Sequence, residues 1–277
     1  FICLKTSMYL RFLLALILVV SGRVFAGNIT TKVYKTTDTR QLTLKVYTPS
    51  DIKENEQRSA IVFFFGGGWK SRRLNQFEPQ VEFLCSKGMV CFIADYRVWQ
   101  TDSVHPVECI KDAKSAIRYI RKNSKHFMIN PDMIAASGGS AGGHLAAATA
   151  YVNKFNDIKD DLSISSKPNA LVLFNPVVDN SETGYGYKRI KDYFPDFSPA
   201  HNIKDPVPTI YFLGDEDIYI TVQSAKEYKK KCEDLGGCCD LYIFKGRKHG
   251  FFNKGVDYEE TLRLTYEFLK KNKFLGK

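Results

Sequence analysis

The chain has 277 residues, of which 44% are hydrophobic and 25% charged, and its formal net charge is +10. This is an ordinary globular composition, and without an internal repeat, a low-complexity tract or a Pro/Gly/Ser-rich linker it favours a single domain. The basic residues are spread along the chain without an aromatic-and-basic module, so we expect a solvated basic surface and no nucleic-acid partner. The spacing of the seven cysteines matches no zinc pattern, and no metal site is predicted.

Residues 1–26 are predicted to be a signal peptide, and residues 1–7 within them read as upstream translation. From Met8 onward an early arginine precedes the apolar stretch 12–20, and the small residues before Gly27 suit signal-peptidase cleavage. This apolar stretch is shorter than the ~20 residues that a spanning helix needs. We therefore expect a secreted or periplasmic protein without stable membrane insertion after cleavage, and an uncleaved N-terminal anchor is the alternative.

The remaining residues, 27–277, are predicted to form one α/β domain. Residues 30–49 alternate polar and apolar side chains around a Thr-Asp-Thr turn, which predicts an N-terminal antiparallel hairpin. Six short apolar runs predict buried strands within 60–69, 89–97, 131–136, 170–176, 209–217 and 239–246, some of which run into the loops that follow. Runs with helical character lie between or after them, at 77–88, 106–124, 144–152, 221–237 and 257–272.

Continuous apolar strands that alternate with helices indicate a mainly parallel sheet, here of eight strands, with helices on both faces. Ligands bind beyond the carboxyl ends of the strands in such sheets. Residues 177–205 have no clear periodicity, and we interpret them as an irregular excursion near that edge rather than a large cap domain. Aromatic side chains among its charges suit a sugar or ferulate ring, or simply fix the segment to the body.

The turn after the strand 131–136 carries the first chemical signal. Residues 138–142 read GGSAG and fit the nucleophile-elbow pattern G-x-S-x-G, in which a strained strand-to-helix turn presents Ser140. A glycine-rich structural turn or a phosphate-binding loop is the alternative. A Walker A loop needs Gly-Lys-Ser/Thr, which is missing, and G-x-G-x-x-G cannot be laid across these residues. Ser140 is therefore the candidate nucleophile.

A serine nucleophile needs a base and an acid that orients the base. His249 lies after the last predicted strand on a glycine-flanked loop, and the loop after the preceding strand reads GDED. In the α/β-hydrolase pattern the acid lies three residues beyond a glycine, which selects Asp217, with Asp215 in reserve and Glu216 less favoured. The other four histidines, at 105, 126, 144 and 201, lie at less suitable places.

Ester attack creates an oxyanion that needs preorganised N–H donors. The backbone N–H of Ala141 at the start of the next helix is one candidate. The backbone N–H groups of Gly67 and Gly68, in the segment FFGGGW after the first long strand, are the others.

These motifs resemble α/β-hydrolase-fold serine esterases, especially the hormone-sensitive-lipase-like and the acetyl-xylan and feruloyl esterase-like branches. The matching stretches are VFFFGGGW, ADYR, HPVECIKDAKSAIRYIR, GGSAGGHLAA, GDED and KHGFF, which extend from Ala60 to Phe252. One departure is Phe65, where the family pattern has the histidine of His-Gly-Gly-Gly, so the support of this loop must differ. We expect Asp95 and Arg97 of ADYR to brace the strand end, and Asp112 the neighbouring helix.

The resemblance implies an exported serine carboxylesterase that works through an acyl-enzyme without metal or cofactor. Ser140, Asp217 and His249 would be catalytic, and Gly67, Gly68 and Ala141 would form the oxyanion hole. The implied partner is acylated polysaccharide, with acetyl or feruloyl groups on xylan, or a small ester. A general short-chain carboxylesterase, a prolyl-oligopeptidase-like serine peptidase, an arylformamidase and a non-catalytic hydrolase-fold binding protein are alternatives. Acyl preference, disulfide pairing and oligomeric state stay open.

Overall fold

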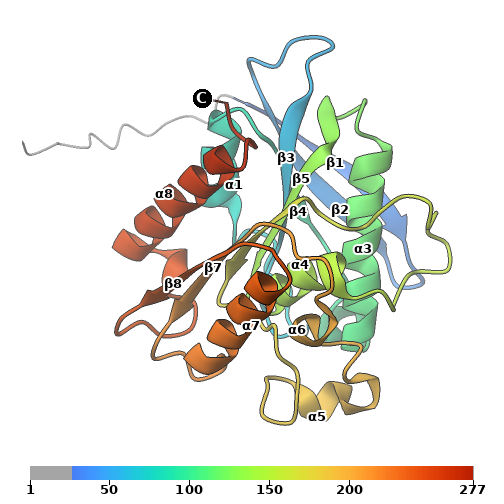
Figure 1. Ribbon diagram of the computed structural model, residues 1–277. Coiled ribbons are helices and arrows are strands. Elements are labelled where there is room, and N and C mark those ends of the chain that lie inside the picture. Colours follow the sequence, from blue (N-terminus) through green and yellow to red (C-terminus); the bar gives the residue numbers. More distant parts are fainter. Residues whose placement is uncertain (1–26, 277) are drawn as a thin grey trace, which may run out of the picture.

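The computed structural model describes residues 27–276, so the predicted signal peptide lies outside the described residues. An eight-stranded sheet has the order β1-β2-β4-β3-β5-β6-β7-β8, which confirms the predicted number of strands (Figure 1). The strands are β1 (Gly27–Thr36), β2 (Gln41–Pro49), β3 (Arg58–Phe64), β4 (Val90–Ala94), β5 (Ile129–Gly139), β6 (Ala170–Phe174), β7 (Thr209–Gly214) and β8 (Cys239–Phe244). Strands β1 and β2 form the antiparallel hairpin, β2 pairs with β4 antiparallel, and every other pairing is parallel.

The sheet has helices on both faces (Figure 1). On one face lie α1 (Glu78–Ser86) and α8 (Gly255–Lys271), and on the other α3 (Pro106–Lys122), α4 (Ala141–Tyr151) and α7 (Val222–Asp234). The central strand β3 sends alternate side chains to the two faces: Val62 and Phe64 join one core, and Ile61 and Phe63 the other. This two-sided burial is why the strand reads as a continuous apolar run.

The predicted excursion after β6 holds only short helical turns: α5 (Tyr187–Ile190), the 3-10 turn η1 (Lys191–Tyr193) and α6 (Pro199–Asn202). Within residues 27–276 no large cap covers the carboxyl edge of the sheet. A four-residue helix that the sequence did not indicate, α2 (Trp99–Asp102), follows β4, and a last 3-10 turn, η2 (Phe251–Asn253), precedes α8.

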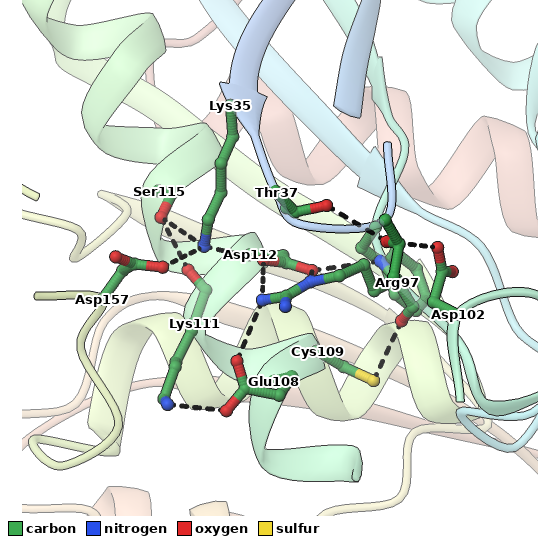
Figure 2. Close-up of polar contacts among 12 residues, drawn as sticks. Lys35, Thr37, Arg97, Asp102, Glu108, Cys109, Lys111, Asp112, Ser115 and Asp157 are labelled. Atoms are coloured by element: carbon green, nitrogen blue, oxygen red, sulfur yellow. Dashed lines mark hydrogen bonds and ion pairs between the residues drawn. The ribbon is translucent and has the colours of Figure 1, made fainter. Parts of the chain in front are cut away.

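A polar network joins the N-terminal hairpin to α3 and to the loop after β4 (Figure 2). The Nζ of Lys35 on β1 lies 2.7 Å from Asp112 Oδ1 and 2.6 Å from Asp157 Oδ2. The guanidinium of Arg97 contacts both oxygens of the same Asp112 carboxylate, each at 2.8 Å, and Glu108 at 2.9 Å. Asp112 therefore holds an edge strand and a loop to the same helix, and its side chain is fully buried.

The six cysteines of the described residues are free thiols, and five of them are buried. Burial raises the pKa of the Cys85 thiol to about 12 and that of Cys232 to about 11. Only Cys238, at the amino end of β8, is exposed. No helix within residues 27–276 is both long and apolar enough to cross a bilayer.

Candidate active site

Ser140 lies at the sharp turn between β5 and α4, as the elbow pattern predicted. Its φ of 54° and ψ of −119° are values that side chains rarely adopt. The turn is fixed by the Ser140 N–H, which donates to the Phe174 carbonyl at 2.9 Å. A Cβ added at Gly142 would lie 2.1 Å from the Phe64 carbonyl oxygen, so the helix can approach β3 only because this residue is glycine.

The structure brings Ser140, His249 and Asp217 into one hydrogen-bonded row. The Nε2 atom of His249 lies 2.9 Å from Ser140 Oγ, and its Nδ1 atom lies 2.7 Å from Asp217 Oδ2. The His249 side chain is 22% exposed and that of Asp217 is fully buried. An imidazole between a hydroxyl and a buried carboxylate can take the serine proton while the carboxylate stabilises the resulting charge.

Three further donors fix the Asp217 carboxylate. Its Oδ1 accepts the backbone N–H groups of Tyr219, at 2.9 Å, and Ile220, at 3.1 Å. Its Oδ2 accepts the side-chain amide of Asn175, at 2.9 Å, in addition to His249. The Asn175 side-chain oxygen in turn accepts the Gly250 N–H at 3.2 Å. Asn175 thus ties the acid to the histidine loop.

The two alternative candidates for the catalytic acid, Asp215 and Glu216, have other surroundings. Asp215 Oδ1 accepts the backbone N–H of Gly246 at 2.6 Å, so this carboxylate supports the turn before the histidine loop. Glu216 donates its backbone N–H to the Arg247 carbonyl at 3.0 Å. Neither side chain is hydrogen-bonded to His249.

Of the four other histidines, three have structural contacts, and His126 is exposed. His144 is fully buried on α4, and its Nε2 donates to the Phe197 carbonyl at 3.0 Å. Burial lowers the pKa of His144 to about 3, so this imidazole is neutral at ordinary pH. His105 accepts the Val107 N–H at the start of α3 and contacts the Arg189 carbonyl, at 2.6 Å, through Nε2. His201 contacts the hydroxyl of a serine three residues before it.

The three backbone N–H groups proposed for the oxyanion hole, at Gly67, Gly68 and Ala141, have no hydrogen-bond partner among residues 27–276. Gly67 and Gly68 line a cavity of about 410 Å³ together with Ser140 and His249. Their φ values of 134° and 63° are open to glycine and strained for other residues. Free donors beside a serine hydroxyl can stabilise a developing oxyanion.

The structure also shows what replaces the family's histidine at Phe65. The Phe65 ring stacks on Tyr96 with centroids 4.0 Å apart, and the Tyr96 hydroxyl donates to the Phe65 carbonyl at 2.6 Å. The next N–H, of Gly66, donates to Gln76 Oε1 at 2.6 Å. Further along, Arg189 Nη1 donates to the Gly68 carbonyl at 2.7 Å. The side chains of Tyr96, Gln76 and Arg189 thus each hold one backbone group of the loop.

The ADYR segment braces this loop, in accordance with its predicted role. Both oxygens of the buried Asp95 carboxylate accept from Arg72, at 2.9 Å, just beyond the glycine loop, and Asp95 also pairs with Arg40. Arg97 holds α3 through Asp112, as described above.

Some aromatic residues of the excursion are buried, and others are exposed or line the cavity at Ser140. Phe197 is fully buried and stacks on His144 with centroids 4.4 Å apart, so it fixes the excursion to α4. Tyr185 lines the Ser140 cavity, and Tyr193 is 40% exposed. The interpretation that the aromatics fix the segment to the body therefore holds for Phe197, whereas contact of Tyr185 or Tyr193 with a substrate ring stays a prediction.

Sequence reasoning missed the supporting residues Asn175, Gln76, Tyr96 and Arg189. Asn175 had a signal, because an Asn-Pro pair directly after a buried strand places a polar side chain at the carboxyl edge. Gln76 and Arg189 lie outside the quoted motifs, and Tyr96 lies within ADYR, which gives no sign of its bond to the Phe65 carbonyl. Within residues 27–276 no group of three or more His, Cys, Asp or Glu side chains is arranged to hold a metal ion.

A model of the BD-FAE family matches residues 44–183, which is half of the chain and includes the glycine loop and the elbow. The chain belongs to the BD-FAE family. The α/β-hydrolase fold and the esterase resemblance expected from the sequence are confirmed.

Among curated relatives, an acetylxylan esterase of Xylanibacter ruminicola is 25% identical over 228 residues, 76% of this chain and 45% of that protein. An endo-1,4-beta-xylanase B of Butyrivibrio fibrisolvens is 25% identical over 77% of this chain and 37% of that protein. The BD-FAE chain thus spans less than half the length of these two curated relatives.

Solved structures match over nearly their whole length. A structure of Thermogutta terrifontis esterase 2, phosphoramylated by tabun, is 41% identical, with a TM-score of 0.85 over 91% of this chain and 97% of that one. Another structure of an esterase from this species has butyrate bound and is 40% identical, with a TM-score of 0.84 over 91% of this chain and 96% of that one.

Proposed function

We propose that this BD-FAE family member is an exported serine carboxylesterase that hydrolyses acyl esters, with acetyl or feruloyl groups on xylan as its substrates. The hydrogen-bonded row of Ser140, His249 and Asp217 beside the free N–H groups of Gly67 and Gly68 carries this proposal. The similarity to an acetylxylan esterase and a xylanase supports the choice of substrate class. Export rests on the sequence pattern of residues 1–26.

In the proposed mechanism, His249 Nε2 takes the proton of Ser140 Oγ while Oγ attacks the ester carbonyl carbon. The N–H groups of Gly67, Gly68 and Ala141 stabilise the oxyanion of the tetrahedral intermediate. The intermediate collapses as His249 returns the proton to the leaving alcohol, which gives an acyl-enzyme on Ser140. Water then attacks the acyl carbon while His249 takes one of its protons. The second tetrahedral intermediate collapses as His249 returns this proton to Ser140 Oγ, and the carboxylic acid leaves.

A general short-chain carboxylesterase is the second candidate. It is supported by the modest cavity of about 410 Å³ at Ser140 and by the likeness to an esterase whose structure holds butyrate. Both candidates use the same catalytic residues. The first takes acetyl or feruloyl groups and releases a polysaccharide hydroxyl, whereas the second takes short acyl chains and releases a small alcohol.

A substrate panel tests the proposal. We expect turnover of p-nitrophenyl acetate, together with acetate release from acetylated xylan or ferulate release from methyl ferulate, and none of N-formylkynurenine or a prolyl peptide. Hydrolysis of p-nitrophenyl acetate without any product from acylated xylan or methyl ferulate would favour the short-chain candidate. Absence of all ester hydrolysis by the folded protein would contradict both.

A paraoxon experiment tests the nucleophile in the same protein. A phosphoryl adduct detected by mass spectrometry on the peptide that contains Ser140, and missing in Ser140→Ala, is the expected result. An adduct that persists in the alanine variant would contradict the assignment.

A further inference from the structure

A second cavity, of about 520 Å³, begins at Trp69, the residue that follows the glycine loop. It is lined by Trp69, Lys70, Trp99, Ser103, Val104, His105, Pro106 and Arg189. Gly68 lines the Ser140 cavity and the next residue, Trp69, lines this one. The two cavities are therefore neighbours, as contact of one extended ligand with both would require.

The charges at the second cavity have one sign. Lys70 and Arg189 line it, no Asp or Glu does, and neither cation forms an ion pair with a carboxylate of residues 27–276. The acid of the same loop, Asp102, has a fully buried side chain that pairs with Arg40. Two cations without a carboxylate partner beside one cavity favour an anionic ligand.

The cavity also offers a flat apolar surface. Trp99 is 58% exposed although it is a large aromatic residue, and Val104 and Pro106 lie beside it. An exposed indole next to cations suits a ring that has an apolar face and carries a carboxylate.

The walls of the cavity are held in place. The Trp99 N–H donates to the Trp69 carbonyl at 3.0 Å, and the Gln100 N–H to the Lys70 carbonyl at 2.9 Å. The Val98 N–H donates to Asp102 Oδ2 at 2.9 Å, and the preceding Arg97 is anchored to Asp112 (Figure 2). A site that is ordered before the ligand arrives loses less entropy on binding.

Arg189 connects the two cavities. Its Nη1 donates to the carbonyl of Gly68, and its guanidinium lies 5.1 Å from the centre of the Trp69 ring and 5.5 Å from that of Tyr185, which lines the Ser140 cavity. The His105 side chain contacts the Arg189 carbonyl at 2.6 Å and holds the backbone at this point.

We propose that this second cavity binds a uronate residue of the polysaccharide whose acyl group is at Ser140, with the sugar ring against Trp99 and the carboxylate at Lys70 and Arg189. The inference rests on the proposed polysaccharide esterase function. It makes the enzyme selective for acyl groups near an acidic branch, because the second contact is lost on a neutral chain.

A binding experiment tests the site without catalysis. The only two tryptophans of the chain both line this cavity, so their fluorescence reports on it. In Ser140→Ala, we expect a saturable fluorescence change with a glucuronate-bearing xylo-oligosaccharide, and a dissociation constant about tenfold higher for the neutral oligosaccharide. Equal affinity for the two, a saturable response to free ferulate alone, or no response would overturn the proposal.

Kinetics with matched variants separate this site from the catalytic one. We expect Lys70→Gln and Trp99→Ala each to raise KM for acetylated glucuronate-bearing oligosaccharides about tenfold and to leave p-nitrophenyl acetate turnover unchanged. Lys230→Gln and Leu162→Ala remove an exposed cation and an exposed apolar side chain elsewhere, and are expected to change neither value. An unchanged KM in both cavity variants contradicts the second site, whereas failure of the wild type to hydrolyse p-nitrophenyl acetate contradicts the esterase proposal itself.

Discussion

Ser140 holds its hydroxyl on a backbone conformation that side chains rarely adopt, with φ at 54°. Such strain costs about 1–3 kcal/mol and persists only where the surroundings enforce it. Here the Phe174 carbonyl and the glycines on either side enforce it. In this conformation the Ser140 hydroxyl lies 2.9 Å from Nε2 of His249.

Removing the Ser140 hydroxyl is expected to abolish ester hydrolysis and to leave the fold intact. The Ser140→Ala variant should lose about 10⁴-fold or more in kcat for p-nitrophenyl acetate, as other triad deletions do. Its midpoint of thermal unfolding should stay close to that of the wild type, because the oxygen lies at a cavity. Full turnover in a variant purified free of other esterases would refute the mechanism.

Substitution of the two aspartates of the GDED loop is expected to change kcat to very different extents. Asp217→Asn replaces the only carboxylate bonded to His249 within residues 27–276, and should lower kcat about 10⁴-fold. Asp215→Asn removes a carboxylate that accepts only a backbone N–H, so kcat should change little. Steady-state kinetics of the two variants test this expectation. A larger loss of kcat in Asp215→Asn than in Asp217→Asn would assign the catalytic acid to Asp215.

Ser140, Asp217 and His249 were predictable because each follows its own strand within a short local pattern. The structure brings these side chains together, and their catalytic roles stay predictions until the variants are measured. Asn175 also follows a strand, but nothing local links it to Asp217, which lies 42 residues further along the chain. No motif links Gln76 to Gly66, which lies ten residues before it. Only the folded sheet shows that the Asn175 amide meets Asp217 and that Gln76 meets Gly66.

Helix α4 buries a histidine that titrates far below its ordinary range. The pKa of His144 is lowered from 6.5 to about 3 by burial, so the unfolded chain binds one more proton than the folded chain between these values. The contribution of neutral His144 to the free energy of unfolding is complete above pH 6.5 and is lost as the pH falls toward 3. In His144→Gln, the decline of unfolding free energy with falling pH should be shallower by about 1.4 kcal/mol per pH unit.

Urea titrations at several values between pH 6.5 and 4 measure that slope. The wild type, measured in the same series, is the reference. An identical slope in His144→Gln would show that His144 binds protons to the same extent in the folded and unfolded chains, which would contradict its lowered pKa.

Helix α3 is joined to the N-terminal hairpin by a buried carboxylate, and removing its charge is expected to destabilise the protein. Asp112→Asn leaves Lys35 and Arg97 without their buried partner, at a cost of about 3–5 kcal/mol in the free energy of unfolding. Asp234→Asn breaks a pair whose side chains are 74% and 59% exposed, and should cost less than about 1 kcal/mol. Equal losses in urea unfolding would contradict a structural role for the network.

The main strands and helices were readable from the sequence because burial on one or both faces leaves a periodic apolar pattern. Helix α2 was not, because four residues carry no period. It is fixed instead by the bond from the Val98 N–H to the Asp102 carboxylate and by the pairing of Asp102 with Arg40. Long-range polar contacts of this kind leave no local signature.

At the scale of the whole molecule, the parallel strands deliver all the proposed catalytic groups to one edge of the sheet. The loops after β3, β5, β7 and β8 carry the glycines, Ser140, Asp217 and His249, and the loop after β4 carries Trp99. The connections that enter these strands lie at the opposite edge. Substitutions in these connections are expected to affect folding and to leave ester turnover intact.

The exposed thiol of the described residues lies at the edge of the sheet opposite the proposed catalytic groups, so it can be labelled without contact with them. Alkylating reagents react with exposed thiolates, and the only exposed thiol within residues 27–276 is Cys238, which precedes β8 at its amino end. His249 follows the carboxyl end of the same strand, so the whole length of β8 separates the two. In protein that begins at Gly27, iodoacetamide is expected to add one label by intact mass while esterase activity persists. Two or more labels on the native protein, or loss of turnover, would contradict this expectation. A fluorophore or a solid support could thus be attached at a single defined point remote from the substrate.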